Sequence, residues 1–207
     1  MTINSVKSKI LRLNPLKRDF IPPEVPVSVV SEVKILGVIF SHDCTFTTHI
    51  KSVTRKANTS LQTLSKIRRF GCNTHSLLRA YLCYERPMLE SACPVWDPSV
   101  LRTIYLMQDL DSVQKRATRI ILSNRDISYH NTLETLELQS LELRLGELIL
   151  RFGKMLLSNP AHRDILPQEA LTVSRSRQKL KLVPERARTN RYQNSFVPFF
   201  TSIYNSA

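Results

Sequence analysis

The apolar residues in the first third of the chain form two patterns, one short and continuous and one long and periodic. Residues 33–40, Val-Lys-Ile-Leu-Gly-Val-Ile-Phe, are a short apolar run that predicts a strand. From Phe46 onward, apolar residues recur three and four positions apart, which is the period of one helix face. They are Ile50, Val53, Ala57, Leu61 and Leu64. The patterns predict a strand followed by a long amphipathic helix that ends near Phe70, around which we expect the other elements to pack.

Two further strands are predicted before this region. Residues 5–13 alternate well enough for an edge strand, and residues 27–30 can form a short strand that pairs with residues 33–40 as a hairpin. Asn14-Pro15 and a group of prolines make the intervening loop irregular. Because such short strands bury little surface alone, we expect only a small β-hairpin or edge sheet at the N-terminus.

The second predicted helix follows the first after a short turn. Asn73 or Thr74 is its expected N-cap, because a side-chain oxygen there can accept a hydrogen bond from the first helical turn. Pro87 is expected to kink it, because proline removes one backbone donor from the helix interior. Pro94 and Pro98 are expected to end it.

Three later segments also show helical periodicity. They are residues 99–122, residues 132–136, and a long helix from a Ser140 cap to Asn159-Pro160. The apolar face of the first of these is expected to bury Ile104, and that of the last to bury Met155. In the last helix, Gly146 and Gly153 lie one heptad apart and cost roughly 1 kcal/mol each relative to Ala unless they allow close helix approach. We interpret them as a contact seam. The predicted fold class is mainly α, with a bundle of four or more helices.

The pattern changes again after Pro167. Residues 174–191 carry seven Lys and Arg and few apolar residues, a composition typical of disordered segments. Aromatic residues then recur at helical spacing, and we expect this tip to dock back on the helices rather than to bind a partner. They are Phe196, Phe199, Phe200 and Tyr204. The chain therefore divides into a β segment (1–45), a helical part (46–168) and a basic, partly disordered tail (169–207).

The charge of the chain is large, positive and concentrated in two segments. The 207 residues carry a formal charge of +13 and the pI is near 10.0, which favours an anionic partner. Residues 33–70 contribute +6 and residues 169–207 contribute +5. On the long first helix, Lys51, Arg55, Lys66 and Arg69 share a narrow sector opposite the apolar stripe. Most charge runs are solvated faces, but here Asp43 is the only acid between residues 33 and 70.

Several classes of site are not favoured. The cysteines, Cys44, Cys72, Cys83 and Cys93, are too far apart for a C-x-x-C pair, so we expect free buried thiols in a reducing compartment rather than zinc ligands. The N-terminus has no apolar leader region, and no run approaches the ~18 apolar residues of a membrane span. The four glycines form no nucleotide-binding loop. We expect an intracellular protein of the cytoplasm or nucleus with no membrane partner and no small-molecule substrate.

A series of short motifs occurs along nearly the whole chain. They are Val33–Val38 followed by His49-Ile50, Tyr81 with Arg86-Pro87-Met88-Leu89, Pro94-Val95-Trp96, Val113–Ile121, Leu138–Leu141, Ile165-Leu166-Pro167 and Arg191–Phe196. In this order they resemble the region that follows the palm in reverse transcriptases of non-LTR (LINE-type) retrotransposons, especially jockey-like elements. Each motif alone is weak, and the ordered series carries the resemblance.

The resemblance implies a role for each part of the chain. Asn4 with Lys7-Ser8 resembles the motif that closes the palm, so Lys7 is a candidate general acid toward pyrophosphate, but only in an intact palm. Lys34 and Gly37 lie in the segment that resembles the primer grip, and the helices from Phe46 onward resemble the thumb and the connection beyond it. The family's catalytic carboxylates precede the lysine motif, on a Tyr/Phe-Ala-Asp-Asp hairpin. We therefore expect Mg²⁺ only in an intact parent polymerase, and no cofactor or metal site in this chain.

The sequence-based interpretation is a C-terminal fragment of such a reverse transcriptase, which binds the RNA or DNA backbone of template and primer without polymerising alone. Asp109 and Asp111, two residues apart on a helix, point away from each other and are interpreted as a solvated face rather than metal ligands. The candidate nucleic-acid-binding residues are Lys34, Gly37, Lys51, Arg55, Lys66, Arg69, Arg175, Arg177, Lys179 and Lys181. Two alternatives stay open: an independent helical nucleic-acid-binding module of the host, and a helical interaction protein whose charge serves only solubility.

Overall fold

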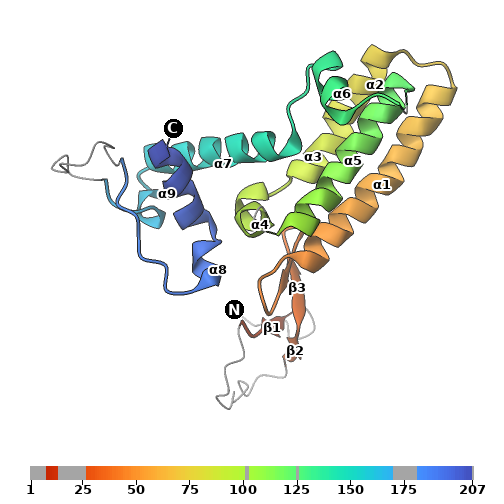
Figure 1. Cartoon of the computed structure of the whole chain (residues 1–207). Helices are drawn as coiled ribbons and strands as arrows, with labels where there is room; N and C mark the ends of the chain where they lie inside the picture. Colours follow the sequence, from red (N-terminus) through yellow and green to blue (C-terminus); the bar gives the residue numbers. More distant parts are fainter. Residues whose placement is uncertain (1–7, 14–26, 101–102, 125, 170–180, 207) are drawn as a thin grey trace.

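The computed structural model of the chain is mainly helical, with two small pairs of strands near the N-terminus (Figure 1). It describes residues 8–13, 27–100, 103–124, 126–169 and 181–206. The helices α1, α3 and α5 lie side by side, α7 runs away from them, and α9 packs beside α7 (Figure 1). This arrangement confirms the predicted fold class, a helical bundle with a small edge sheet.

The strands form two separate pairs rather than one sheet. β1 (Lys9–Leu11) pairs in parallel with β2 (Ser28–Val30), and β3 (Glu32–Ile35) pairs antiparallel with β4 (Val38–Ser41). The edge strand predicted within residues 5–13 is present as β1. The predicted pairing of residues 27–30 with residues 33–40 is wrong, because β2 pairs with β1 and the 33–40 run folds back on itself.

The reversal between β3 and β4 takes place at Leu36 and Gly37. Both residues have positive φ, 47° and 94° respectively, as the two central residues of a type I′ hairpin turn require. Such a turn usually carries Asn or Gly at its first position, and a leucine there looks like part of a continuous strand. The prediction of one strand over residues 33–40 is wrong for this reason.

α1 (Thr47–Arg69) confirms the long amphipathic helix. Its predicted apolar stripe is buried, and α5 packs along it. Phe46 precedes the helix in a left-handed conformation and is itself buried against Phe40, with ring centroids 5.7 Å apart. The aromatic pair fixes the angle at which the chain leaves β4 and enters α1.

The second helix is divided by a π-helical turn rather than a simple kink. α2 (Thr74–Ala80) is capped by Asn73, whose side chain accepts a hydrogen bond of 2.8 Å from the Ser76 N–H, as predicted. A π-helical turn, η1 (Tyr81–Glu85), then leads into α3 (Arg86–Glu90). Pro87 lies in the first turn of α3, where its missing N–H costs nothing because the wider turn has already shifted the hydrogen bonds.

The two later prolines begin a new helix instead of ending the old one. α4 (Cys93–Val100) contains both Pro94 and Pro98, so the prediction that they end the second helix is wrong. Ala92 has φ 55° and reverses the chain direction between α3 and α4. Trp96 is completely buried and donates its indole N–H to the Ser91 carbonyl at 2.8 Å.

α5 (Ile104–Leu122) is shorter than the helix predicted from residue 99, because α4 occupies residues up to 100. Its core face is buried as predicted, with the exception of Ile104, which is exposed, and Ile120, which is half-buried. α6 (Tyr129–Thr135), close to the predicted segment 132–136, packs against α5.

α7 (Leu141–Ser158) joins two hydrophobic clusters. Ser140 caps it as predicted, by accepting a hydrogen bond from the Leu143 N–H. Leu141 and Leu145 belong to the main core, whereas Ile149 belongs to a second cluster that also contains Phe200 of α9 (Phe196–Ser206). The docking of the aromatic tip is thereby confirmed.

Two predictions about α7 are wrong in part. Met155 was expected in the core but is 54% exposed, and Leu156 is buried in its place. The glycine seam holds only at Gly153, whose α-carbon lies against the Phe200 ring, while the space beside Gly146 is open.

The start of the described tail, at Lys181 and Leu182, is hydrogen-bonded to α9. The Asn205 side chain of α9 accepts hydrogen bonds from the N–H groups of Lys181 and Leu182, both at 2.9 Å, and donates one to the Leu182 carbonyl. Leu182 is buried in the second cluster, and α8 (Asn190–Gln193) precedes α9. Lys181 and Leu182 therefore dock on α9, and residues 174–180 of the segment expected to be disordered lie outside the described part.

The cysteines are free, but only Cys93 is buried. Burial, together with the nearby charges of Asp97 and Glu90, raises the pKa of the Cys93 thiol to about 12, so this thiol stays protonated. Cys44 is half-buried and Cys72 and Cys83 are exposed, so the prediction of buried thiols is wrong for these three.

Candidate nucleic-acid interface

The outer face of α1 carries the cations that the sequence placed there. Lys51, Arg55, Lys66 and Arg69 are all exposed and lie opposite the buried stripe. At 1.5 Å per residue, the 23 residues of α1 make a face about 34 Å long. The exposed side chains of Thr59 and Gln62 lie between the two pairs of cations and offer neutral hydrogen-bonding groups.

The cations of this face are not neutralised within the described part of the protein. None of the four forms an ion pair with a described carboxylate. The ion pairs that the described part contains involve other Arg residues and one His. Asp109 of α5 lines a groove of about 440 Å³ together with Lys51 and Arg55. Lys66 and Arg69 lie in the last turn of α1, where the helix dipole favours positive charge.

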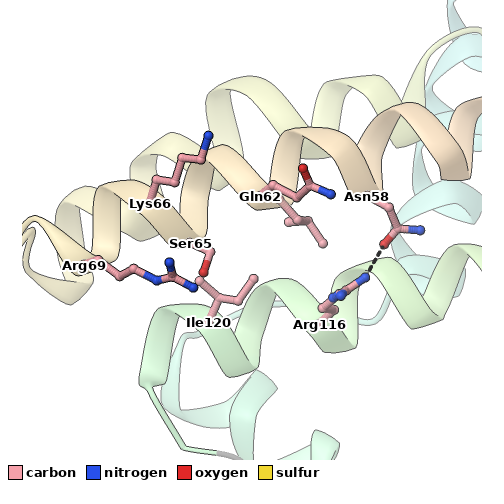
Figure 2. A pocket seen from close by; sticks show the side chains of 8 residues that line it. Asn58, Gln62, Ser65, Lys66, Arg69, Arg116 and Ile120 are labelled. Atoms are coloured by element: carbon pink, nitrogen blue, oxygen red, sulfur yellow. Dashed lines mark hydrogen bonds between the residues drawn. The ribbon is translucent and has the colours of Figure 1, made fainter.

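α5 adds a cation to the same face that the sequence did not indicate. Arg116 lines a second groove, of about 330 Å³, with Lys66 and Arg69 (Figure 2). Its Nη1 donates a hydrogen bond of 3.3 Å to the Asn58 side-chain oxygen on α1. Arg116 belongs to one of the motifs, but only the packing of α5 on α1 places it beside the basic face.

The ends of α1 are held firmly, so the face is a rigid surface. Arg68, in the last turn of α1, donates a hydrogen bond to the Ile121 carbonyl of α5. Near the other end, the Nδ1 atom of His49 accepts a hydrogen bond of 3.4 Å from the Ile39 N–H of β4. Burial lowers the pKa of His49, and the charges of Lys56 and Lys34 lower it further, so the imidazole stays neutral and acts as an acceptor.

The hairpin presents the two residues of the predicted grip at the surface. Lys34 of β3 and Gly37 of the turn are both exposed. Leu36, beside Gly37, is 100% exposed, and Ile35 is 51% exposed. A fully exposed leucine in a left-handed conformation is an unfavourable choice for stability alone, and the hairpin tip presents two exposed apolar side chains, Ile35 and Leu36.

The structure does not bring the remaining predicted residues to α1. Lys7, Arg175, Arg177 and Lys179 lie outside the described residues. Lys181 is exposed beside α9, with its ammonium 5.3 Å from the centre of the Tyr204 ring. In Figure 1, α9 and α1 lie on opposite sides of the molecule, so Lys181 is not part of the α1 face.

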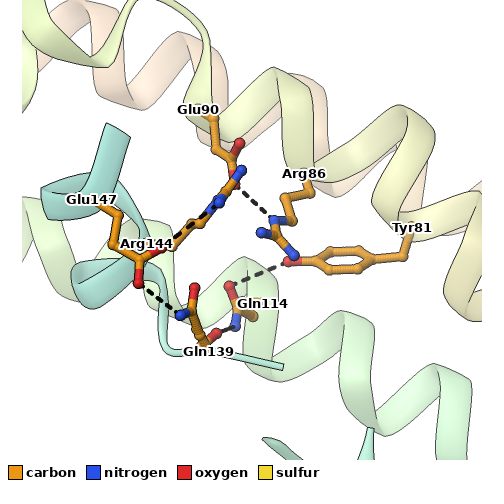
Figure 3. A network of polar contacts seen from close by, with 7 residues as sticks. All are labelled: Tyr81, Arg86, Glu90, Gln114, Gln139, Arg144 and Glu147. Carbon is orange, nitrogen blue, oxygen red and sulfur yellow. Dashed lines mark hydrogen bonds and ion pairs between the residues drawn. The ribbon is translucent and has the colours of Figure 1, made fainter. Parts of the chain in front are cut away.

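Several motif residues form a polar network, buried at Tyr81 and Gln114 and more exposed elsewhere, between helices of the bundle (Figure 3). The Tyr81 hydroxyl donates to the Gln114 side-chain oxygen at 3.2 Å, and the Gln114 amide donates to the Gln139 carbonyl at 2.9 Å. Glu90 accepts from Arg86 at 2.7 Å and from Arg144 at 3.0 Å. The network joins η1 and α3 to α5 and α7, so its role is structural.

The described acids do not fit the two-metal site of a polymerase. No three described His, Cys, Asp or Glu side chains are grouped closely enough to hold a metal ion. Asp109 and Asp111 are both half-buried, and burial raises the pKa of the Asp111 carboxyl, so the prediction that the two form a solvated face is wrong. Asp97 of α4 is completely buried and neither of its oxygens has a described hydrogen-bond donor.

Comparison of the chain with protein-family models, with curated proteins and with solved structures finds no match. Among the helices described, none has the length and apolar character needed to cross a bilayer. The case for function therefore depends on the surface of α1, the hairpin and the ordered motifs.

Proposed function

We propose that the chain binds the sugar–phosphate backbone of a nucleic acid through the exposed face of α1 and the tip of the β3–β4 hairpin. In this proposal it is a C-terminal fragment of a non-LTR retrotransposon reverse transcriptase, with the hairpin as primer grip and the helices from α1 onward as thumb and connection. The proposed membership of the reverse transcriptase family depends on the ordered motifs. The proposal of nucleic-acid binding depends on the α1 surface and is independent of the family.

The observation that carries the proposal is the unneutralised charge of α1. Lys51, Arg55, Lys66 and Arg69 project from one helix, without a described ion pair, over about 27 Å. Cations in such a row repel one another, which lowers stability slightly unless an anion is present. A phosphate backbone is a linear anion of matching extent, and each phosphate that the protein neutralises releases counterions.

The test is a quadruple substitution of Lys51, Arg55, Lys66 and Arg69 by Gln. Because these side chains lie opposite the buried stripe, the melting temperature is expected to stay the same or rise slightly. Binding to a short RNA/DNA hybrid or DNA duplex is expected to weaken strongly. The slope of log affinity against log salt should fall by roughly 0.7–0.9 for each phosphate that is no longer neutralised.

Lys154→Gln is the control for loss of a positive charge outside the α1 face, because Lys154 is exposed on α7 and lines neither α1 groove. Binding that is equal in the quadruple variant and the wild type would overturn the proposal and favour a helical interaction protein. Binding that disappears in the quadruple variant and persists in the control supports it.

A second test separates the fragment from an intact polymerase. The 207 residues contain no adjacent Asp-Asp pair of the kind the family uses to hold Mg²⁺. Primer extension by the pure chain with Mg²⁺ or Mn²⁺ is therefore expected to give no template-dependent incorporation. Template-dependent incorporation would contradict the proposal that this chain binds nucleic acid without polymerising alone.

A further inference from the structure

The groove between the C-terminal half of α1 and α5 combines three cations with no described acid. Lys66 and Arg69 line it from α1, and Arg116 lines it from α5 (Figure 2). Its other lining residues are neutral: Asn58, Leu61, Gln62, Ser65 and Ile120. None of the three cations has an ion pair with a described carboxylate. An anion bound among them would remove their mutual repulsion.

The neighbouring groove, toward the N-terminal half of α1, differs in one respect. It is lined by Lys51 and Arg55 but also by Asp109, whose carboxylate supplies a counter-charge. The two grooves share Asn58 and Gln62, so they follow one another along α1. Of the two, the groove with Arg116 is the one whose positive charge has no counter-charge among the described residues.

The cations of this groove come from two helices held in a fixed relation. Arg116 donates to the Asn58 side-chain oxygen at 3.3 Å, and Arg68 donates to the Ile121 carbonyl, so α1 and α5 are tied together beside the groove. With its oxygen engaged by Arg116, the Asn58 amide presents its N–H groups, and Gln62 and Ser65 present further donors. Preformed donors and cations lower the cost of ordering a bound anion.

We infer that Arg69 and Arg116 form a subsite for a single phosphate group between α1 and α5, with Lys66 at its edge. For a backbone phosphate the inference rests on the proposed function; for a free phosphate ion it does not. The phosphate oxygens accept hydrogen bonds from the two guanidinium groups, with neutral donors of Asn58, Gln62 and Ser65 beside them. The Lys66 ammonium points away from both arginines in Figure 2 and adds positive charge at the edge of the groove. Arg116 thereby extends the binding surface from one helix to two.

The test compares Arg116→Gln with Arg119→Gln. Both residues are exposed on α5 and both substitutions remove one charge, but Arg119 does not line the groove. For duplex binding, the salt slope is expected to fall by roughly 0.7–0.9 in Arg116→Gln and to stay at the wild-type value in Arg119→Gln. For free phosphate, melting temperatures are compared in phosphate and in chloride at equal ionic strength. A rise in phosphate that Arg116→Gln abolishes shows that the subsite also takes the free ion.

Each outcome decides the inference. An effect of Arg116→Gln on the duplex slope alone identifies a backbone-phosphate subsite, and an effect on both measurements identifies one that takes either source. If Arg116→Gln behaves like Arg119→Gln in both measurements, the subsite does not exist. In that case the quadruple α1 variant still decides the proposed function, because Lys51 and Arg55 lie outside this groove.

Discussion

The ring of Phe200 lies directly against the α-carbon of Gly153, so that a methyl group at position 153 would overlap the ring. This contact lets α9 approach α7 closely, and Phe200 is completely buried as a result. Gly153→Ala is expected to displace Phe200 and to destabilise the protein by about 1–3 kcal/mol, as overpacking in a core does. Urea unfolding measures the change.

Gly146→Ala is the matched control, because Gly146 lies one heptad earlier in the same helix and has open space beside it. There the same substitution is expected to stabilise the protein by up to about 1 kcal/mol, through helix propensity alone. Equal effects at the two positions would show that α9 does not pack on α7 in the way described.

This pair also shows what sequence patterns can and cannot predict. The spacing of Gly146 and Gly153 indicated a contact but not which glycine makes it, because the partner, Phe200, is far along the chain. Arg116 lies on the polar face of its own helix, and only the packing of α5 on α1 makes it part of the basic groove. Non-local contacts of this kind do not affect local periodicity, so a sequence pattern cannot indicate them.

Local patterns predicted α1 and the caps well because their causes are local. The stripe from Ile50 to Leu64 and the caps Asn73 and Ser140 depend on residues within a few turns. The hairpin was predicted wrongly for the opposite reason. A leucine at positive φ departs from the usual turn chemistry, so nothing at Leu36 indicated a turn.

The buried carboxyl of Asp97 is expected to make stability depend on pH. Burial raises its pKa to about 7, and the charge of Glu142 contributes in the same direction. The folded state therefore binds a proton that the unfolded state releases near pH 4, and stability falls as pH rises from about 4 through 7. Asp97→Asn should remove this loss, which amounts to roughly 4 kcal/mol between pH 4 and 8.

Urea unfolding of the wild type and Asp97→Asn at several pH values measures the difference. Glu142→Gln, which removes only the nearby charge, is expected to reduce the pH dependence slightly and not to abolish it. Parallel curves for the wild type and Asp97→Asn would mean that Asp97 finds a hydrogen-bond donor in solution.

Substitutions of Tyr81 and Gln114 are expected to have non-additive effects on the free energy of unfolding, because the two side chains share a hydrogen bond. Tyr81→Phe leaves the buried Gln114 oxygen without its donor and should cost about 1–3 kcal/mol. Gln114→Leu should also destabilise, because the Gln139 carbonyl loses a donor. The double variant is expected to cost less than the sum of the two by about 1 kcal/mol.

Tyr84→Phe is the control for this cycle, since Tyr84 lies in the same π-helical turn but is 73% exposed. It should leave the unfolding free energy unchanged. Strict additivity of Tyr81→Phe and Gln114→Leu would show that the hydrogen bond between them contributes nothing.

The exposed tip of the hairpin gives a prediction in which stability and binding change in opposite directions. Leu36→Asn should stabilise the protein by about 0.5–1 kcal/mol, because asparagine tolerates the left-handed conformation that leucine adopts at φ 47°. If the tip contacts nucleic acid, the same substitution removes apolar contact area and affinity should fall severalfold. The salt slope should stay unchanged, because an uncharged leucine neutralises no phosphate.

Leu143→Asn, at an exposed leucine on α7, is the control and should leave the affinity for the duplex unchanged. Melting curves and duplex titrations at several salt concentrations measure both effects. A stabilised Leu36→Asn variant that binds as tightly as the wild type would remove the hairpin from the interface and leave α1 and α5 as the whole binding surface.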